Sequence, residues 1–436
     1  MIVYDSSAVL RDLGHVGVAG IDLVPALSAI VHITSFDVGA ERPSLTTRAV
    51  AVASRAQRIA TSRVARASVA VPAPLDRRPV LAAMTGVERV GRISGPVLDV
   101  LGRDRCAVVT TEAGPAAGRL SRRPVGRSEL SALLRPHWAQ IRATVDAVGD
   151  RHGLPLVTRG ALLGGFASAA ANILRSRDVL DRVRPDVVLV EHDRRLAEAV
   201  LCAVARQRGI PTVTLVHGVQ GNLTEDIQWT PLVADSVVVW GDWMADAFAD
   251  AGVARDRIGI GGYPRLSPLP PLAPPARPRV VYLSASLGDA KPAVDTFLAA
   301  AKELSGWDVA VRPHPRESLA WYRQRGVRVQ DSATMTMEDT LASASVVVGV
   351  SSTACLDAAL LGVPTVLIAG QGGTEIPLLD RAVREGLAVQ ASADGLTQAI
   401  RTALEGPGVQ DVSGLARALG AEAAQATAGW VQRVSR

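Results

Sequence analysis

Short apolar segments alternate with helix-length segments through most of this chain, and this pattern limits the folds it can adopt. Polar or glycine residues follow directly after segments such as PDVVLV, PTVTLV and SVVVW, and a helix-length segment then follows several of them. Continuous apolar strands separated by helices are typical of parallel sheets that helices cover on both faces. The pattern therefore predicts an α/β fold with doubly wound sheets.

A proline-rich segment divides the pattern into two halves. Seven prolines lie between Pro264 and Pro278, and such a run cannot join a sheet and behaves as a semi-rigid spacer. The alternation starts again at Arg279, so we expect two Rossmann-like domains that face each other across a cleft. The expected parts are an N-terminal extension of unclear structure (1–77), an N-terminal domain (78–263), a linker (264–278), a C-terminal domain (279–405) and a helical tail (406–436).

The composition excludes several functional classes. With 48% hydrophobic and 20% charged residues among 436, the chain can bury a sizeable core. Aromatic residues make up only 3%, which disfavours the stacking platforms of single-strand nucleic-acid binders. The three cysteines are far apart and form no CxxC pair, so we expect neither a disulfide framework nor a metal site.

The charge is mildly basic and dispersed. The net charge is +5, and the arginines are interspersed with acidic residues, so nothing indicates a nucleic-acid partner. An arginine-bearing segment, 47–71, predicts a helix that is more often solvated than docked on a membrane. We find no signal peptide or membrane span, and we expect a cytoplasmic protein for which contact with the inner face of the membrane stays open.

The most specific pattern for a ligand is VVVGVSSTACLDAALLGVP, from Val346 to Pro364. A buried strand ends there, and Ser351, Ser352 and Thr353 form the turn into a helix. Backbone N–H groups and the positive end of a helix suit a phosphate, but a simple N-cap by a serine explains the turn equally well. Asp357, one turn further on, is a candidate to accept a hydrogen bond from a ribose hydroxyl or to complement the helix N-terminus.

Two further loops follow strands of the second half. Arg312-Pro313-His314-Pro315-Arg316 holds a histidine between two prolines and two arginines, a group suited to a phosphate. The loop after Leu283 begins with small residues, including Ser284 and Ser286, that would let a ligand approach the backbone.

Polar residues also follow strands of the first half and include candidates for a general base. Glu88, Glu191 and Asp193 are the carboxylates at such strand ends, and the residues do not decide among them. His217 follows the next strand and could orient a substrate or stabilise a leaving phosphate. We find no GxSxG or GxGxxG motif and no metal-ligand spacing.

From about Pro185 to Gln390 the chain resembles bacterial GT-B transferases of surface-polysaccharide synthesis. These include capsule Kdo transferases, polysialyltransferases and CDP-glycerol glycerophosphotransferases. The residues that carry the resemblance are PDVVLVEHD, LVHGVQG, the ADSVVVWGDW…GGYPRL run, RPHPRES and SSTACLDAALLGVPTV. The resemblance implies that His314-Pro315 and Ser351, Ser352 and Thr353 bind the nucleotide phosphate of the donor. It implies that the general base lies in Glu191-His192-Asp193.

The resemblance implies a metal-independent glycosyltransferase that uses a nucleotide-activated donor as co-substrate and no other cofactor. The donor would be a sugar or glycerol phosphate, with a CMP or CDP carrier favoured, and the acceptor a hydroxyl of a surface glycan or a lipid-linked glycan. Two alternatives stay open: a non-hydrolysing nucleotide-sugar 2-epimerase, faintly indicated by Thr374-Glu375-Ile376-Pro377, and an inactive member that binds nucleotide or glycan.

Overall fold

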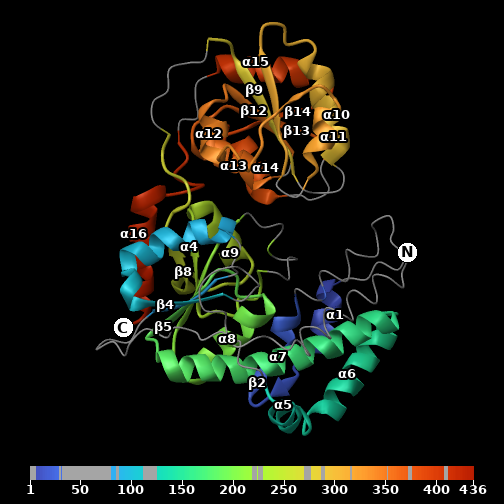
Figure 1. Ribbon diagram of the computed structural model, residues 1–436, viewed down its shortest axis with the longest axis vertical. Helices are drawn as coiled ribbons and strands as arrows, with labels where there is room; N and C mark the ends of the chain where they lie inside the picture. Colours follow the sequence, from blue (N-terminus) through green and yellow to red (C-terminus); the bar gives the residue numbers. More distant parts are fainter. Residues whose placement is uncertain are drawn as a thin grey trace.

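The structure is a computed structural model, and Figure 1 shows its two lobes, one above the other. It describes residues 6–28, 31, 80–84, 88–110, 125–218, 223, 229–269, 276–285, 290–314, 317–350, 352–371, 376–406 and 411–436. Each lobe contains one six-stranded sheet in which every strand pair is parallel. The described residues thus form two doubly wound α/β domains, as the sequence predicts.

The N-terminal domain has the strand order β4-β3-β5-β6-β7-β8. Alternate residues of its strands enter two different hydrophobic clusters, so that Leu81 packs on one face of the sheet and Ala82 on the other. Burial on both faces explains why these strands read as continuous apolar segments. The strands are β3 (Val80–Met84), β4 (Cys106–Thr110), β5 (Val187–Val190), β6 (Thr212–Leu215), β7 (Ser236–Val239) and β8 (Ile258–Ile260).

The longest helix in the described part of the chain, α7, belongs to this domain. It packs against α5, α6 and α8 and crosses the lower part of the domain in Figure 1, with α5 below it. The helices are α4 (Glu88–Leu101), α5 (Arg127–Leu134), α6 (Trp138–Arg151), α7 (Leu156–Val183), α8 (Leu196–Gln207) and α9 (Asp242–Asp250).

The C-terminal domain has the strand order β11-β10-β9-β12-β13-β14. Its strands are β9 (Arg279–Leu283), β10 (Asp308–Arg312), β11 (Arg328–Val329), β12 (Val346–Gly349), β13 (Thr365–Ile368) and β14 (Val389–Ala391). Its helices are α10 (Ala290–Ala301), α11 (Leu319–Arg323), α12 (Met337–Ala342), α13 (Thr353–Leu360), α14 (Pro377–Arg384) and α15 (Leu396–Glu405). Here too, Val280 and Val281 enter clusters on opposite faces of the sheet.

Part of the expected N-terminal extension belongs to the N-terminal domain. Its elements are α1 (Ser6–Leu13), the antiparallel pair of β1 (Gly17–Val18) and β2 (Ile21–Asp22), and a short 3-10 helix (Val24–Leu27). Their apolar side chains share one cluster with α6, α7 and α8, so this segment completes the domain core. The arginine-bearing segment 47–71 and linker residues 270–275 lie outside the described residues.

The C-terminal tail returns to the N-terminal domain. Its helix α16 (Gly420–Val434) packs against α4 and β8, so the tail is a structural part of the first domain. Figure 1 shows α16 beside α4, below the C-terminal domain. The chain therefore passes between the domains twice, once through the linker and once before α16.

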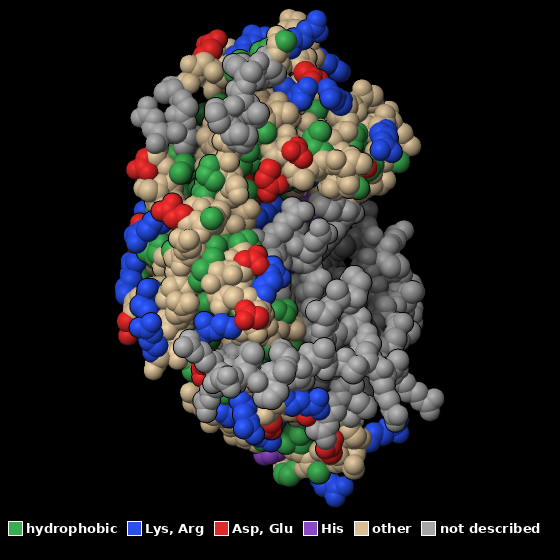
Figure 2. Space-filling model, turned by 60° about the vertical axis from the view of Figure 1, so that its left-hand side comes forward, with side chains coloured by type: hydrophobic (Ala, Val, Ile, Leu, Met, Phe, Trp, Pro, Cys, Tyr) green, Lys and Arg blue, Asp and Glu red, His purple; other side chains and the backbone are tan. Residues whose placement is uncertain are grey.

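Charged side chains of both signs are interspersed over the face shown in Figure 2. The described surface on this face carries no area of a single sign, as the sequence composition indicates. Among the described residues, no helix is long and apolar enough to span a membrane.

Candidate functional site

In each sheet the strand order reverses at one point, and several of the predicted site residues follow the strands on either side of it. In the C-terminal domain, β10 and β11 follow β9 on one side, whereas β12 lies on the other side of β9. Ligands of open parallel sheets bind outside the carboxyl ends of the strands at such a switch point. Ser284, which follows β9, and Ser352, which follows β12, therefore flank the expected ligand position.

In the N-terminal domain the corresponding switch lies between β3 and β5. Glu191 directly follows β5, and His217 follows the neighbouring strand β6. The structure brings the His217-Gly218 loop against the other domain: a Cβ atom on Gly218 would lie 3.9 Å from the Thr353 hydroxyl. Two motifs that are 135 residues apart in the sequence thus meet across the domain boundary.

The imidazole of His217 is held in one tautomer. Its Nδ1 lies 2.8 Å from the backbone carbonyl oxygen of Glu191. A carbonyl oxygen only accepts hydrogen bonds, so Nδ1 carries the proton and Nε2 is the nitrogen with the lone pair in the neutral ring. The side chain is half-buried at the end of β6, a position that suits a proton acceptor.

An aromatic cluster supports this histidine, and it includes a residue that the sequence analysis did not single out. Trp229 is stacked on His192, with ring centroids 4.5 Å apart, and its centroid lies 5.3 Å from that of His217. Burial, followed by the charge of His217, holds the pKa of His192 well below its ordinary value. His192 is thus a neutral ring that contributes packing.

Glu191 is placed differently from what a carboxylate base requires. Its side chain is only 1% exposed, and it accepts a hydrogen bond from the Ser94 hydroxyl of α4. The carboxylate links β5 to α4, while its backbone carbonyl orients His217. Glu191 therefore contributes to the site through its main chain, which corrects the prediction that its side chain is the base.

Asp193 is a structural residue of the domain interior. It is fully buried, and its Oδ2 accepts hydrogen bonds from the N–H groups of Val233 (2.7 Å) and Ala234 (2.8 Å). Burial raises its pKa, and these N–H groups offset part of that effect. An acceptor hydroxyl cannot reach a carboxylate enclosed in this way, so the prediction of Asp193 as a base is wrong. The side chain of Glu88, the third candidate, lies outside the described residues.

The start of α13 has the geometry of an ordinary N-cap. The Ser352 hydroxyl accepts a hydrogen bond from the Ala354 N–H at 3.2 Å, and Thr353 is the first helical residue. Both side chains are half-buried, and Thr353 faces the loop of His217. A helix start of this kind offers N–H groups and a positive dipole end to an anion. Ser351 lies outside the described residues.

Asp357 does not face a ribose position. It is 1% exposed, and its Oδ2 lies 3.5 Å from Nη2 of Arg265, a residue at the start of the linker. The carboxylate is enclosed where α13 meets the linker, so the predicted contact with a ribose is wrong.

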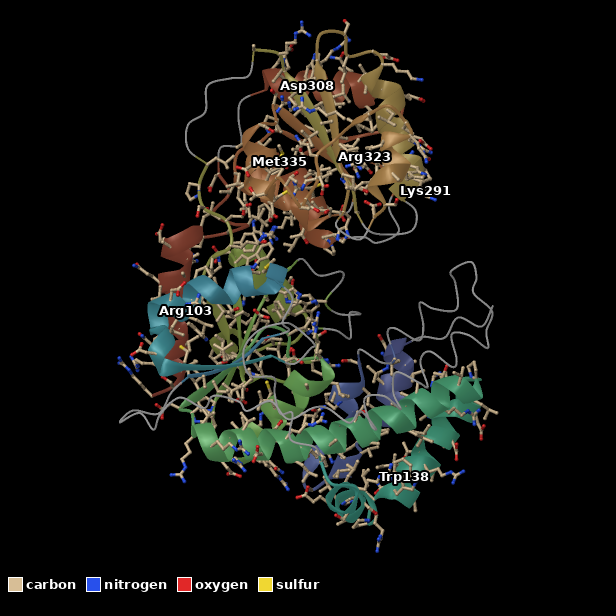
Figure 3. The ribbon with its side chains drawn as sticks, viewed as in Figure 1. Arg103, Trp138, Lys291, Asp308, Arg323 and Met335 are labelled. Atoms are coloured by element: carbon tan, nitrogen blue, oxygen red, sulfur yellow. The ribbon has the colours of Figure 1, made fainter. Side chains whose placement is uncertain are left out.

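The loop after β10 is only partly as expected. Arg312 is buried, and its guanidinium donates hydrogen bonds to the Thr340 hydroxyl of α12 (2.6 Å) and to the Met335 carbonyl (3.0 Å). It ties β10 to α12, near Met335 in Figure 3, so its predicted role in contacting a phosphate is not supported. His314 is half-buried, and its backbone N–H donates to the Glu317 carboxylate at 2.7 Å, which fixes the loop.

The loop after β9 begins with a buried hydroxyl. Ser284 accepts a hydrogen bond from the Tyr322 hydroxyl of α11 at 3.0 Å, and this contact joins β9 to α11. Burial raises the pKa of Tyr322 to about 12. Ser284 therefore has a structural partner, while Ser286 and Arg316 lie outside the described residues. Among the residues the structure describes, no group of three or more His, Cys, Asp or Glu side chains could hold a metal ion.

Three residues of the site were missed by sequence reasoning: Ser94, Trp229 and Arg265. Trp229 is one of only seven tryptophans and lies between two strands, and this was the available signal for it. The contacts of Ser94 and Arg265 join residues 97 and 92 positions apart, and no local pattern marks such a pair.

No model of a known protein family matches the chain, and no curated protein sequence matches it. Among solved structures, a glycotransferase of kitacinnamycin is similar with a TM-score of 0.53 and 16% identity, covering 83% of this chain and 100% of that chain. A UDP-GlcNAc 2-epimerase from Neisseria meningitidis, solved with bound UDP-GlcNAc, has a TM-score of 0.50 and 13% identity, covering 82% and 99%. At these identities the likeness concerns the fold, and the predicted GT-B arrangement of two Rossmann-like domains is confirmed.

Proposed function

We propose that this chain is a glycosyltransferase that moves a group from a nucleotide-activated donor to an acceptor hydroxyl. The observation that carries the proposal is the contact of the His217-Gly218 loop with the start of α13 at Thr353. A proton acceptor on one domain faces an anion-binding helix start on the other. A group transfer needs this pairing, because a nucleophile must lose a proton while a phosphate leaves.

In the proposed reaction, the acceptor hydroxyl oxygen attacks the anomeric carbon of the donor, and the bond from that carbon to the phosphate oxygen breaks. The hydroxyl proton moves to Nε2 of His217, and the hydrogen bond from Nδ1 to the Glu191 carbonyl stabilises the resulting imidazolium. The neighbouring ring of His192, whose centroid lies 5.4 Å from that of His217, is neutral and adds no opposing charge.

The leaving nucleotide gains negative charge on its phosphate. The N–H and hydroxyl groups at Ser352 and Thr353, together with the helix dipole of α13, would stabilise that charge. His314, on the loop after β10, is the candidate for a further hydrogen-bond donor to this phosphate. Arg312 would act indirectly, because it fixes α12 and the strand that carries this loop.

The first experiment is a thermal-shift panel with CMP, CDP, UDP, GDP and dTDP. A nucleotide at 100 times its dissociation constant stabilises the folded chain by about 2.7 kcal/mol, which is readily measured. We expect one nucleotide to raise the melting temperature and the Thr353→Val variant to reduce that rise. No shift with any nucleotide would overturn the proposal. The resemblance in sequence favours CMP or CDP, and a selective shift with UDP or dTDP would refute that part alone.

A surface glycan or a lipid-linked glycan remains the proposed acceptor, on the resemblance in sequence alone. A 2-epimerase is the second candidate, supported by the fold similarity to the Neisseria meningitidis enzyme. Thr374 and Glu375, which faintly indicated it, lie outside the described residues, and Ile376 caps α14. Conversion of a UDP-sugar without any acceptor would favour the epimerase, whereas conversion only with an acceptor favours the transferase.

A further inference from the structure

The two passages between the domains lie side by side. The Tyr263 N–H donates to the Ala418 carbonyl at 2.8 Å, and the Gly420 N–H donates to the Tyr263 carbonyl at 3.2 Å. The ring of Tyr263 is stacked on Trp240, with centroids 3.9 Å apart. The linker therefore leaves the N-terminal domain from a fixed and fully packed position.

Arg265, two residues further along the linker, contacts the other domain. Its Nη2 lies 3.5 Å from Oδ2 of Asp357, and its Nη1 donates to the Tyr263 hydroxyl at 3.4 Å. The exposed fractions of the Arg265 and Asp357 side chains are 11% and 1%. Burial and the charge of Asp357 raise the pKa of Tyr263, so the phenol stays protonated beside the pair.

The ion pair of Arg265 and Asp357 connects the linker to α13, the helix whose start lies next to the His217 loop. Asp357 lies one turn after Thr353 in α13, and Ala359 and Leu360 of the same helix pack in an apolar cluster that contains residues of both domains. A buried carboxylate needs a cation nearby, because an isolated charge in the interior is very unfavourable. The ion pair with Arg265 thus adds a charged contact to the apolar packing of α13 against the first domain.

We propose that Arg265 and Asp357 are positioning residues that fix the start of α13 against the His217 loop. The proposal rests on the proposed function, since it concerns the distance between a proton acceptor and a phosphate site. Without the pair, α13 would still form, but the two domains would adopt a wider range of relative positions. The pair touches no reacting atom, and it acts through Thr353.

The test compares the unsubstituted chain with the double variant R265M/D357L. Removing both charges leaves no orphaned ion, and an apolar replacement of a buried pair is often neutral for stability. Nitroxide labels on D256C and E303C report the distance between the domains, since both positions are exposed and the three native cysteines are buried. We expect a narrow distance distribution in the unsubstituted chain and a distinctly broader one in the double variant.

Arg279→Met is the matched control, because Arg279 forms an ion pair with Asp308 inside the C-terminal domain at 2.6 Å. It should leave the distribution narrow. With substrates, the double variant should lose up to about 100-fold in kcat while nucleotide affinity changes little, since a small misplacement of reacting groups costs about that much. A double variant that folds with a narrow distribution overturns this proposal. Absence of nucleotide binding by the unsubstituted chain would instead overturn the proposed function.

Discussion

His217 and His192 lie in one aromatic cluster, yet the fold prepares them for different roles. His217 is half-buried and donates from Nδ1 to a backbone carbonyl, which leaves Nε2 as the basic nitrogen of the neutral ring. His192 is buried against Trp229, and its pKa is lowered. Their environments therefore separate the proposed proton acceptor, His217, from a packing residue, His192, although the sequence around them offers two similar histidines.

Replacing His217 by Asn should abolish most of the transfer activity. The amide N–H of Asn can keep the contact with the Glu191 carbonyl, but Asn has no basic nitrogen. We expect kcat to fall by about 100-fold to 10,000-fold, the range of general-base catalysis, with nucleotide affinity nearly unchanged. His15→Asn, at an exposed histidine paired with Asp22, should keep full activity. If the H217N variant is active and the Glu191→Gln variant is inactive, the general base is the Glu191 carboxylate and not His217.

His192 should make the chain less stable in mild acid. Its pKa is depressed in the folded state, whereas the unfolded chain has the ordinary value of 6.5. Below that pH the unfolded state binds a proton that the folded state refuses, so stability is present above pH 6.5 and is lost as the pH falls. The free energy of unfolding should decrease by about 1.4 kcal/mol per pH unit from this group.

Urea unfolding between pH 7.5 and pH 5 measures this slope, and His192→Gln should flatten it. Asp193, with its raised pKa, contributes with the opposite sign, but it is present in both proteins and cancels in the comparison. Parallel curves for the two proteins would show that His192 is not the group responsible.

At the residue scale, sequence reasoning singled out strand ends, but it could not show which side chains at those ends are buried. Glu191 and His217 were both candidates, and the structure joins them through a backbone carbonyl. The burial of Asp193 depends on the N–H groups of Val233 and Ala234, about 40 residues away. A carboxylate at the end of a parallel strand has the same sequence pattern whether it faces a ligand or caps a distant loop.

At the scale of elements, the start of α13 is an N-cap and has a proposed role in binding a phosphate, and two caps in one domain can separate these roles. Ser352 caps α13, and Thr336 caps α12 with its hydroxyl accepting from the Asp339 N–H at 3.0 Å. Replacing either residue by Ala should cost about 1 kcal/mol of stability in urea unfolding. Only Ser352→Ala should also weaken nucleotide binding in titration calorimetry. Equal nucleotide affinities of the two variants would remove α13 from the donor site.

The strands of both sheets were predictable because continuous apolar segments report burial on two faces. Helix boundaries were less accessible. The segment over 128–148 has a continuous helical pattern, but it consists of two helices, α5 and α6, which are separated at Arg135, Pro136 and His137. The helix α4 begins at Glu88 and runs through Pro96, although a proline in the sequence favours a start close to it. Packing of α4 against α16, more than 300 residues later, supports it, and no local pattern contains that contact.

At the scale of the molecule, the two passages between the domains form the hinge on which both proposals depend. The return segment before α16 approaches the first domain so closely that Gly262 has no space for a side chain. A Cβ atom there would lie 2.5 Å from the Ala418 carbonyl oxygen, and the φ of Gly262 is +86°. Sequence reasoning found the proline-rich linker, but the partner of the linker is a segment about 150 residues later.

Gly262→Ala should therefore lower the free energy of unfolding by more than the backbone strain of a positive φ alone would. Gly209 is the matched control, since its φ is +68° and a Cβ there meets nothing within 4 Å. Gly209→Ala should cost about 1–2 kcal/mol, the strain of the left-handed region. Gly262→Ala should cost about 1–3 kcal/mol more, because the linker and the backbone of Ala418 must move apart.

Urea unfolding of the two variants measures the difference, and the label pair D256C/E303C shows where the strain is released. If the return segment yields, the distance distribution should broaden in Gly262→Ala and stay narrow in Gly209→Ala, because of these two glycines only Gly262 contacts the return segment at Ala418. Equal costs and equal distributions would mean that the two passages are held loosely. In that case Arg265 and Asp357 would have no rigid base from which to position α13.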